Sequence, residues 1–256
     1  MKKRFTVLGC GSSLGSPWIN LYWGNSEKNN KKNFRTRCCA HIQYKSLSIL
    51  IDTSPDIKQQ LINNKIRDVD AIIYTHEHAD QTAGIFEFRP FFFSKKKRIP
   101  IYCNLDTKKR IKSSYPWLFK SNKLYPQIIE VKNLKKNFSI IKDKIKVNIE
   151  SIDVIHGKVK TRGYLFENVA YISDCNFIPK HSMDKLKNLN FLIIDCFRLK
   201  SHVTHLNLEK TLKLIEILKP KKAILTNMHV DLDYNYLKKI LPKNVVPAYD
   251  GMNFNF

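Results

Sequence analysis

The feature of this sequence that most constrains its fold is a short apolar segment that runs directly into two closely spaced histidines. Residues 71–74 suit one buried strand, and Thr75-His76-Glu77-His78-Ala79-Asp80-Gln81 follows at once. In extended backbone, side chains two positions apart share a face, so His76, His78 and Asp80 can converge beyond the strand. Two imidazoles and a carboxylate form a donor set for zinc or a neighbouring first-row ion. A lone histidine would more often be structural, but three alternating donors favour a metal site.

Three further donors occupy the same position relative to other apolar runs. His156, Asp174 and His229 each come directly after a segment that is predicted to be a strand. Taken singly, they have ordinary explanations as a loop histidine, a turn aspartate and a strand-end cap. Their common placement at the carboxyl ends of strands favours one shared site, which requires a fold that brings these ends together.

The rest of the pattern mixes strands and helices along the whole chain. Strands are predicted at 4–8, 40–44, 47–51, 71–74, 146–155, 163–167, 169–172, 191–195 and 223–226, and helices at 56–63, 81–88 and 206–218. Hairpin connections such as 40–51 are foreign to a purely parallel sheet. The predicted fold class is therefore α+β, a four-layer αββα sandwich of two mixed sheets with helices outside.

The domain organisation is predicted to be simple. No internal repeat or linker is visible, so we expect one domain over residues 1–256. A lysine-rich variable segment at about 94–146 is expected to combine αβ structure with a surface insertion. The helix at 81–88 is expected to stop before Pro90, because proline disfavours helical backbone in the residue before it.

The formal net charge of +23 could reflect a phosphate-rich partner, because clustered Lys and Arg attract anions. Lysine far outnumbers arginine, however, and Asn and Ile are abundant, so compositional drift is the preferred explanation. A nucleic-acid partner is left open but not favoured, since the lysines are spread along the chain rather than interleaved with aromatics on one face. No apolar run approaches the roughly 18 residues of a membrane span, so no membrane partner is expected.

Six scattered cysteines without a CxxC pair indicate buried thiols in a reducing compartment. The basic start Met1-Lys2-Lys3-Arg4 is followed by too short an apolar stretch for an export signal, which needs roughly 7–15 residues. A cytoplasmic location is therefore expected.

The histidine pattern and several longer motifs resemble the metallo-β-lactamase superfamily, and in particular its branch of phosphoribosyl cyclic phosphodiesterase-like (PhnP-like) hydrolases. The superfamily pattern is HxHxDH, a later His, a later Asp and a final His. The resemblance covers almost the whole chain and is weakest across 94–146. The branch motifs are Leu8-Gly9-Cys10-Gly11-Ser12-Ser13-Leu14-Gly15, Arg35-Thr36-Arg37-Cys38, Thr204-His205-Leu206-Asn207-Leu208-Glu209 and Asn227-Met228-His229-Val230-Asp231-Leu232-Asp233-Tyr234.

This resemblance implies one or two divalent metal ions, Zn or Mn, as cofactors. It also implies a hydrolase, specifically a phosphodiesterase that acts on a small cyclic or diester phosphate through a metal-bound hydroxide. Asp80 would orient that hydroxide, and His205 would contact the scissile phosphate or assist the leaving group. The implied metal ligands are His76, His78 and His156 for the first ion, Asp80 and His229 for the second, and Asp174 as the bridge.

The chain departs from the family pattern in two places. Gln81 stands where a metal-binding histidine is usual, and its amide oxygen would be a weak ligand that manganese tolerates better than zinc. The first loop carries Gly24-Asn25-Ser26 in place of the cysteines of a structural zinc site, so none is expected.

Two alternatives to the small-molecule phosphodiesterase stay open. One is a tRNA- or RNA-processing nuclease of the same fold, although no extended substrate-binding arm is visible in the sequence. The other is a non-catalytic binding protein in which Gln81 marks a degenerate second metal site. Thioester and lactam substrates, and a homodimeric state, are also left open, because fold alone does not fix function.

Overall fold

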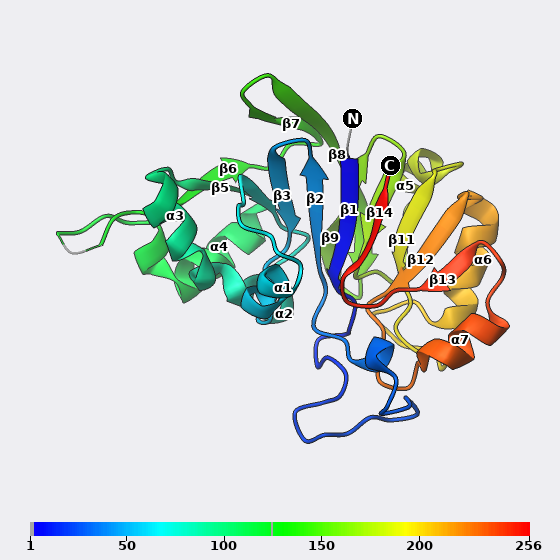
Figure 1. Ribbon diagram of the computed structural model, residues 1–256. Coiled ribbons are helices and arrows are strands. Elements are labelled where there is room, and N and C mark those ends of the chain that lie inside the picture. Colours follow the sequence, from blue (N-terminus) through cyan, green and yellow to red (C-terminus); the bar gives the residue numbers. More distant parts are fainter. Residues whose placement is uncertain (1–2, 124) are drawn as a thin grey trace.

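The structure, a computed structural model, describes residues 3–123 and 125–256. Two seven-stranded sheets lie face to face at its centre, and helices flank them on both sides (Figure 1). The strand order is β14-β1-β2-β3-β4-β5-β6 in the first sheet and β13-β12-β11-β10-β9-β8-β7 in the second.

The first sheet is antiparallel on one side and parallel on the other. Neighbours from β14 to β3 run antiparallel, whereas β3, β4, β5 and β6 run parallel. Its strands are β1 (Lys3–Gly9), β2 (Cys39–Tyr44), β3 (Leu47–Ile51), β4 (Ala71–Ile73), β5 (Ile99–Cys103), β6 (Ile129–Asn133) and β14 (Met252–Asn255).

The second sheet has the same mixed character. Neighbours from β7 to β10 run antiparallel, and those from β10 to β13 run parallel. The predicted α+β sandwich of two mixed sheets is therefore confirmed. The strands are β7 (Asn137–Lys142), β8 (Ile145–His156), β9 (Val159–Phe166), β10 (Val169–Ile172), β11 (Phe191–Asp195), β12 (Lys222–Thr226) and β13 (Val245–Pro247).

Helices pack outside both sheets, and local sequence explains their ends. In α6 the side chain of Asn207 accepts a hydrogen bond from the Lys210 backbone, while Ile215 and Leu218 point into the core. The α-helices are α1 (Ile57–Asn63), α2 (Ala79–Thr82), α3 (Arg89–Lys95), α4 (Leu105–Ser114), α5 (Lys180–Met183), α6 (Leu208–Leu218) and α7 (Tyr234–Ile240). Shorter 3-10 turns are η1 (Lys31–Asn33), η2 (Ala83–Phe88), η3 (Pro116–Leu118) and η4 (Asp184–Leu186).

The main hydrophobic core lies between the sheets, and a second one lies between the first sheet and its helices. Phe5 of β1 meets Tyr171 of β10 with 5.9 Å between ring centroids. Leu50 and Phe88 belong to the second core. Both faces of the first sheet are buried, and the Arg162 amide of β9 donates to the Thr75 carbonyl (3.1 Å), which connects the end of β4 to the second sheet.

One local expectation is wrong. The helix predicted over 81–88 is a short α2 followed by η2, and Pro90 lies in the first turn of α3 instead of ending a helix. Proline is accepted there because the first turn needs no backbone donor. The segment 94–146 contains the αβ structure that was expected there, since it includes α4 and supplies β5 and β6 to the first sheet and β7 to the second. Buried and partly exposed positions alternate in β5, and most lysines of this segment lie between its strands.

All six cysteines are free and buried. Among the described helices, none has both the length and the apolar character needed to cross a membrane. The two ends of the chain meet where β14 pairs with β1, and the Phe256 amide donates to the Lys3 carbonyl at 3.2 Å.

Candidate metal centre

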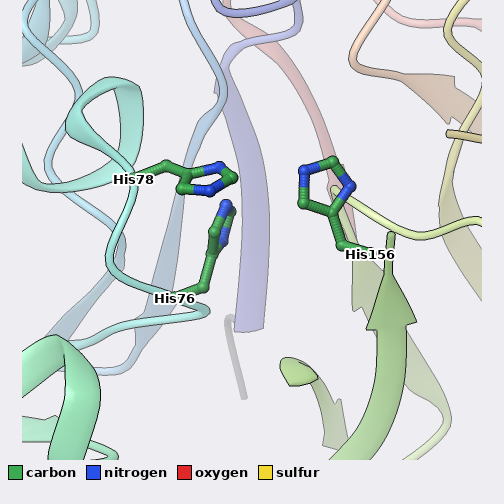
Figure 2. A group of neighbouring side chains, drawn as sticks. All are labelled: His76, His78 and His156. Carbon is green, nitrogen blue, oxygen red and sulfur yellow. The ribbon is translucent and has the colours of Figure 1, made fainter. Parts of the chain in front are cut away.

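Three imidazoles from two distant segments face one another at the carboxyl ends of the strands. His76 and His78 lie in the loop between β4 and α2, and His156 is the last residue of β8 (Figure 2). Their nearest donor atoms all lie within 4.8 Å of one another. The ring centroids are 4.4 Å apart for His76 and His78, and 5.3 Å apart for His78 and His156. The structure thus brings together the three residues predicted for the first ion.

The tautomer of His76 is set by a chain of hydrogen bonds. The Thr75 hydroxyl donates to Asp52 Oδ2 (2.9 Å) and lies 3.0 Å from His76 Nδ1. Since a hydroxyl has only one hydrogen, Nδ1 is the donor to Thr75 and Nε2 keeps its lone pair. That Nε2 is buried and has no hydrogen-bond partner among the described residues.

His156 has the same arrangement. Its Nδ1 lies 2.7 Å from the carbonyl oxygen of Thr204, which can only accept, so Nε2 again keeps the lone pair. Burial lowers the pKa of His76 to about 3 and also lowers the pKa of His156. Neutral imidazole is the form that binds a metal, so both rings are held in the state that coordination requires.

A second group of donors shares His156 and adds Asp174 and His205. Asp174 follows β10 and is almost fully buried. Burial alone would raise the pKa of Asp174, but electrostatic interactions with the surrounding imidazoles outweigh it and hold that pKa below its ordinary value. The carboxylate therefore stays ionised between the imidazoles, where a cation would also be stabilised.

His205 is oriented by a fully buried carboxylate at the end of β11. Its Nδ1 lies 3.0 Å from Asp195 Oδ2, which also accepts backbone hydrogen bonds from Cys175 and Leu206. Burial disfavours the charged ring, but the Asp195 charge and hydrogen bond outweigh it and raise the pKa of His205. This pair resembles the histidine–carboxylate pairs that fix a tautomer in acid–base catalysis.

Asp80 and Gln81 lie in the short helix α2, next to Asp174. The Gln81 amide nitrogen donates to Asp80 Oδ2 (3.2 Å) and to Asp174 Oδ2 (3.3 Å). Burial, with the Asp174 charge as a second cause, raises the pKa of Asp80 to about 6. The Gln81 Oε1 is buried and lacks a partner among the described residues. The amide thus lies between two carboxylates that repel each other, where the family pattern has a histidine.

His229 is held slightly apart from these donors. Its Nδ1 lies 3.0 Å from Asp231 Oδ2, and the rings of Trp18 and Phe197 flank it at 5.6 and 5.2 Å. Within residues 3–123 and 125–256, neither three-residue donor group includes His229 or Asp80. Their assignment to a second ion therefore stays a prediction.

Sequence reasoning missed the residues that support the ligands. Asp195 is the last residue of a predicted strand, and Asp174 likewise comes just after one. The position of Asp195 could therefore have identified it as a site residue. Asn227, whose amide nitrogen donates to both Asp174 (3.3 Å) and Asp195 (3.1 Å), gave no such signal. Thr75 and Thr204 act through a hydroxyl and a backbone carbonyl, which no spacing rule reveals.

The residues present fit a divalent ion. A buried, unpartnered Nε2 on His76 is costly unless an electrophile satisfies it. Neutral imidazoles together with an ionised carboxylate form the donor set that zinc and its first-row neighbours prefer.

Comparisons with known proteins agree with this geometry. A family model described as the beta-lactamase superfamily domain matches residues 48–228, so the chain belongs to that superfamily. The crystal structure of a new diphosphatase from the PhnP family is similar over 100% of this chain and 98% of that chain, with a TM-score of 0.92 and 31% identity. The chain is thus a PhnP-like hydrolase of the metallo-β-lactamase fold, as the motifs predicted.

More distant structures share the fold. Zn-bound PqqB from Methylobacterium extorquens matches with a TM-score of 0.81 at 13% identity, covering 99% of this chain and 100% of that chain. The short form of human tRNase Z matches with a TM-score of 0.70 at 14% identity, covering 98% of each chain.

One curated relative is an octanoyltransferase from Porphyromonas gingivalis (strain ATCC BAA-308 / W83). It is 26% identical over 253 residues, which are 97% of this chain but 51% of the relative. The chain therefore spans about half the length of that relative.

Proposed function

We propose that this protein hydrolyses a small cyclic or diester phosphate with the help of one or two divalent ions, zinc or manganese. The observation that carries the proposal is the convergence of His76, His78 and His156 beside an ionised Asp174, with Nε2 unprotonated on His76 and His156. A bound ion would supply Lewis acidity and lower the pKa of water from about 16 to about 7.

The remaining polar residues have separate parts in this proposal. Asp80 is positioned beside Asp174 to accept a hydrogen bond from the attacking water and hold its direction of attack. His205 donates from Nδ1 to Asp195, so the proton on its Nε2 is free to be given to the departing oxygen. A cationic His205 also offsets negative charge on the phosphate.

Support for a phosphate substrate comes from charge and from relatives. The chain has a net charge of +23, which raises the local concentration of anions. The similar PhnP-family protein is a diphosphatase, and human tRNase Z shares the fold. Phosphodiesters and phosphoanhydrides therefore belong in the same substrate screen.

The test is hydrolysis of bis-p-nitrophenyl phosphate and of a nucleoside diphosphate by protein loaded with manganese or zinc. We expect metal-dependent release of p-nitrophenol or phosphate, and loss of that release in the His78→Ala variant. Equal rates for the two proteins would contradict the proposal. Lys221→Ala, which changes an exposed residue, is the matched control and should retain full activity.

A second candidate is hydrolysis of an acyl ester or thioester. Its motivation is the octanoyltransferase relative, which matches 97% of this chain over 51% of its own length. The same ions can polarise a carbonyl as well as a phosphoryl oxygen. Turnover of p-nitrophenyl octanoate without turnover of either phosphate substrate would favour this candidate.

A further inference from the structure

One strongly basic part of the chain lies on the outer side of the first sheet. Residues 83–127 hold eleven Lys and Arg against two Asp and Glu, which is a net +9 of the total +23 in under a fifth of the chain. This region includes η2, α3, α4 and η3, all on the outer side of the first sheet (Figure 1).

Aromatic rings are exposed within this basic region. The side chains of Phe86 and Phe93 are both 44% exposed, Trp117 is 38% exposed and Tyr125 is 48% exposed. Large aromatic side chains are normally covered, so four exposed rings in one region indicate a binding surface.

Three of these rings surround one cation. The guanidinium carbon of Arg89 lies 5.9 Å from the ring centroid of Phe93, and 5.6 Å from those of Trp117 and Tyr125. Within residues 3–123 and 125–256 this guanidinium makes no hydrogen bond or ion pair, so its N–H groups are available to an acceptor. We call Arg89 with Phe93, Trp117 and Tyr125 the Arg89 patch.

We propose that the Arg89 patch binds single-stranded nucleic acid. Bases would stack on the exposed rings, and phosphates would contact Arg89 and the exposed lysines nearby, such as Lys96 and Lys120. Aromatic rings interleaved with cations favour a ligand that has both flat bases and regular negative charge. A membrane-binding surface would instead have an apolar tip, with no guanidinium among its aromatic rings.

The patch is connected to the metal centre by a short, packed segment. The chain passes from α2 through η2 into α3, and Tyr115 donates to the Ala83 carbonyl at 3.1 Å. At 1.5–2.0 Å per residue, the backbones of Asp80 and Arg89 are at most about 18 Å apart. A strand held by the patch could therefore deliver a terminal phosphodiester to the metal centre, a step that rests on the proposed function whereas the binding does not.

The test is fluorescence anisotropy with a labelled single-stranded RNA of about 12 nucleotides. The double variant Arg89→Ala/Trp117→Ala should bind about tenfold more weakly or worse, since each stacked base contributes substantially. Its salt dependence should also be less steep, by about 0.7 in the log–log slope for each lost phosphate contact. The matched control Lys221→Ala/Tyr236→Ala removes one exposed cation and one exposed ring elsewhere and should bind as the parent does.

Four results would overturn the proposal. They are equal affinity of the Arg89 variant and the parent, equally tight binding of duplex RNA, binding to phosphatidylserine vesicles without binding to RNA, and a dimer that the Arg89 variant disrupts. Thermal melting of each variant separates lost binding from lost folding. All binding is measured in the His78→Ala background with EDTA, so that a failure of RNA binding and a failure of the phosphodiesterase are seen independently.

Discussion

The two halves of the metal centre are built differently although they share His156. In the histidine half, His76 and His156 donate Nδ1 to fixed acceptors and leave Nε2 free. In the carboxylate half, amide groups of Gln81 and Asn227 donate to Asp174, which neighbours Asp80 and Asp195.

The two halves therefore differ in electrostatic repulsion when no cation is bound. Neutral imidazoles do not repel one another, so the histidine half can be preorganised before an ion arrives. Adjacent carboxylates do repel, and the amide N–H groups reduce that repulsion. We therefore expect the histidine half to bind an ion tightly and the carboxylate half to bind one weakly.

The largest expected effect comes from His156→Ala, because His156 belongs to both halves. This variant should lose all bound metal and all turnover, whereas His78→Ala should keep residual metal in the carboxylate half. Metal content by mass spectrometry, with turnover on bis-p-nitrophenyl phosphate, checks both. Identical metal content in the two variants would show that the two halves do not bind metal independently of each other.

Asp195→Asn should lower kcat by about 10²-fold, because His205 would lose the carboxylate that orients it. Metal content should be unchanged. The matched control is Asp250→Asn, which removes a partly buried carboxylate whose pKa burial likewise raises to about 6, but one that hydrogen-bonds Thr36 and Cys10 instead of a histidine. Equal losses of kcat in both variants would assign Asp195 a purely structural role.

Thr75→Val should weaken metal binding by about 10–100-fold, because the His76 tautomer would no longer be fixed. Isothermal titration with zinc measures this loss. Thr107→Val is the control, since Thr107 is equally buried but its hydroxyl has no hydrogen-bond partner in the described chain. An unchanged zinc affinity for Thr75→Val would mean that fixing the His76 tautomer contributes nothing to metal binding.

The smallest effect is expected from Gln81→His. An imidazole would replace the amide between Asp80 and Asp174, so the metal content should rise toward two ions per chain while turnover changes only a few-fold. A large gain in turnover from an inactive parent would instead favour the alternative of a degenerate, non-catalytic site. Gln81→Ala, which offers no ligand, should not raise the metal content.

Most of the fold was predictable because strand alternation and strand-end donors are local signals. The hairpin at 40–51 and the position of His156 at the end of β8 follow from such patterns. The strands within 94–146 were harder to recognise, because β5 has only five residues and β6 and β7 each have a single buried position, which leaves little of a two-residue period to detect.

Within the site, only the metal ligands were predictable, because metal ions bind particular types of side chain. His76, His78 and His156 can be inferred from residue type and spacing, and the structure brings them together. The Asn227 amide and the Thr204 carbonyl depend on tertiary contacts between segments far apart in sequence. The Arg89 patch likewise depends on Phe93, Trp117 and Tyr125 folding around one side chain.

The pairing of β14 with β1 determines what can be attached to this molecule. Because β4 runs in the same direction as β1, the metal ligands lie at one end of the strands and both chain ends lie at the other. An affinity tag, a surface linker or a fused enzyme would therefore project away from the metal centre.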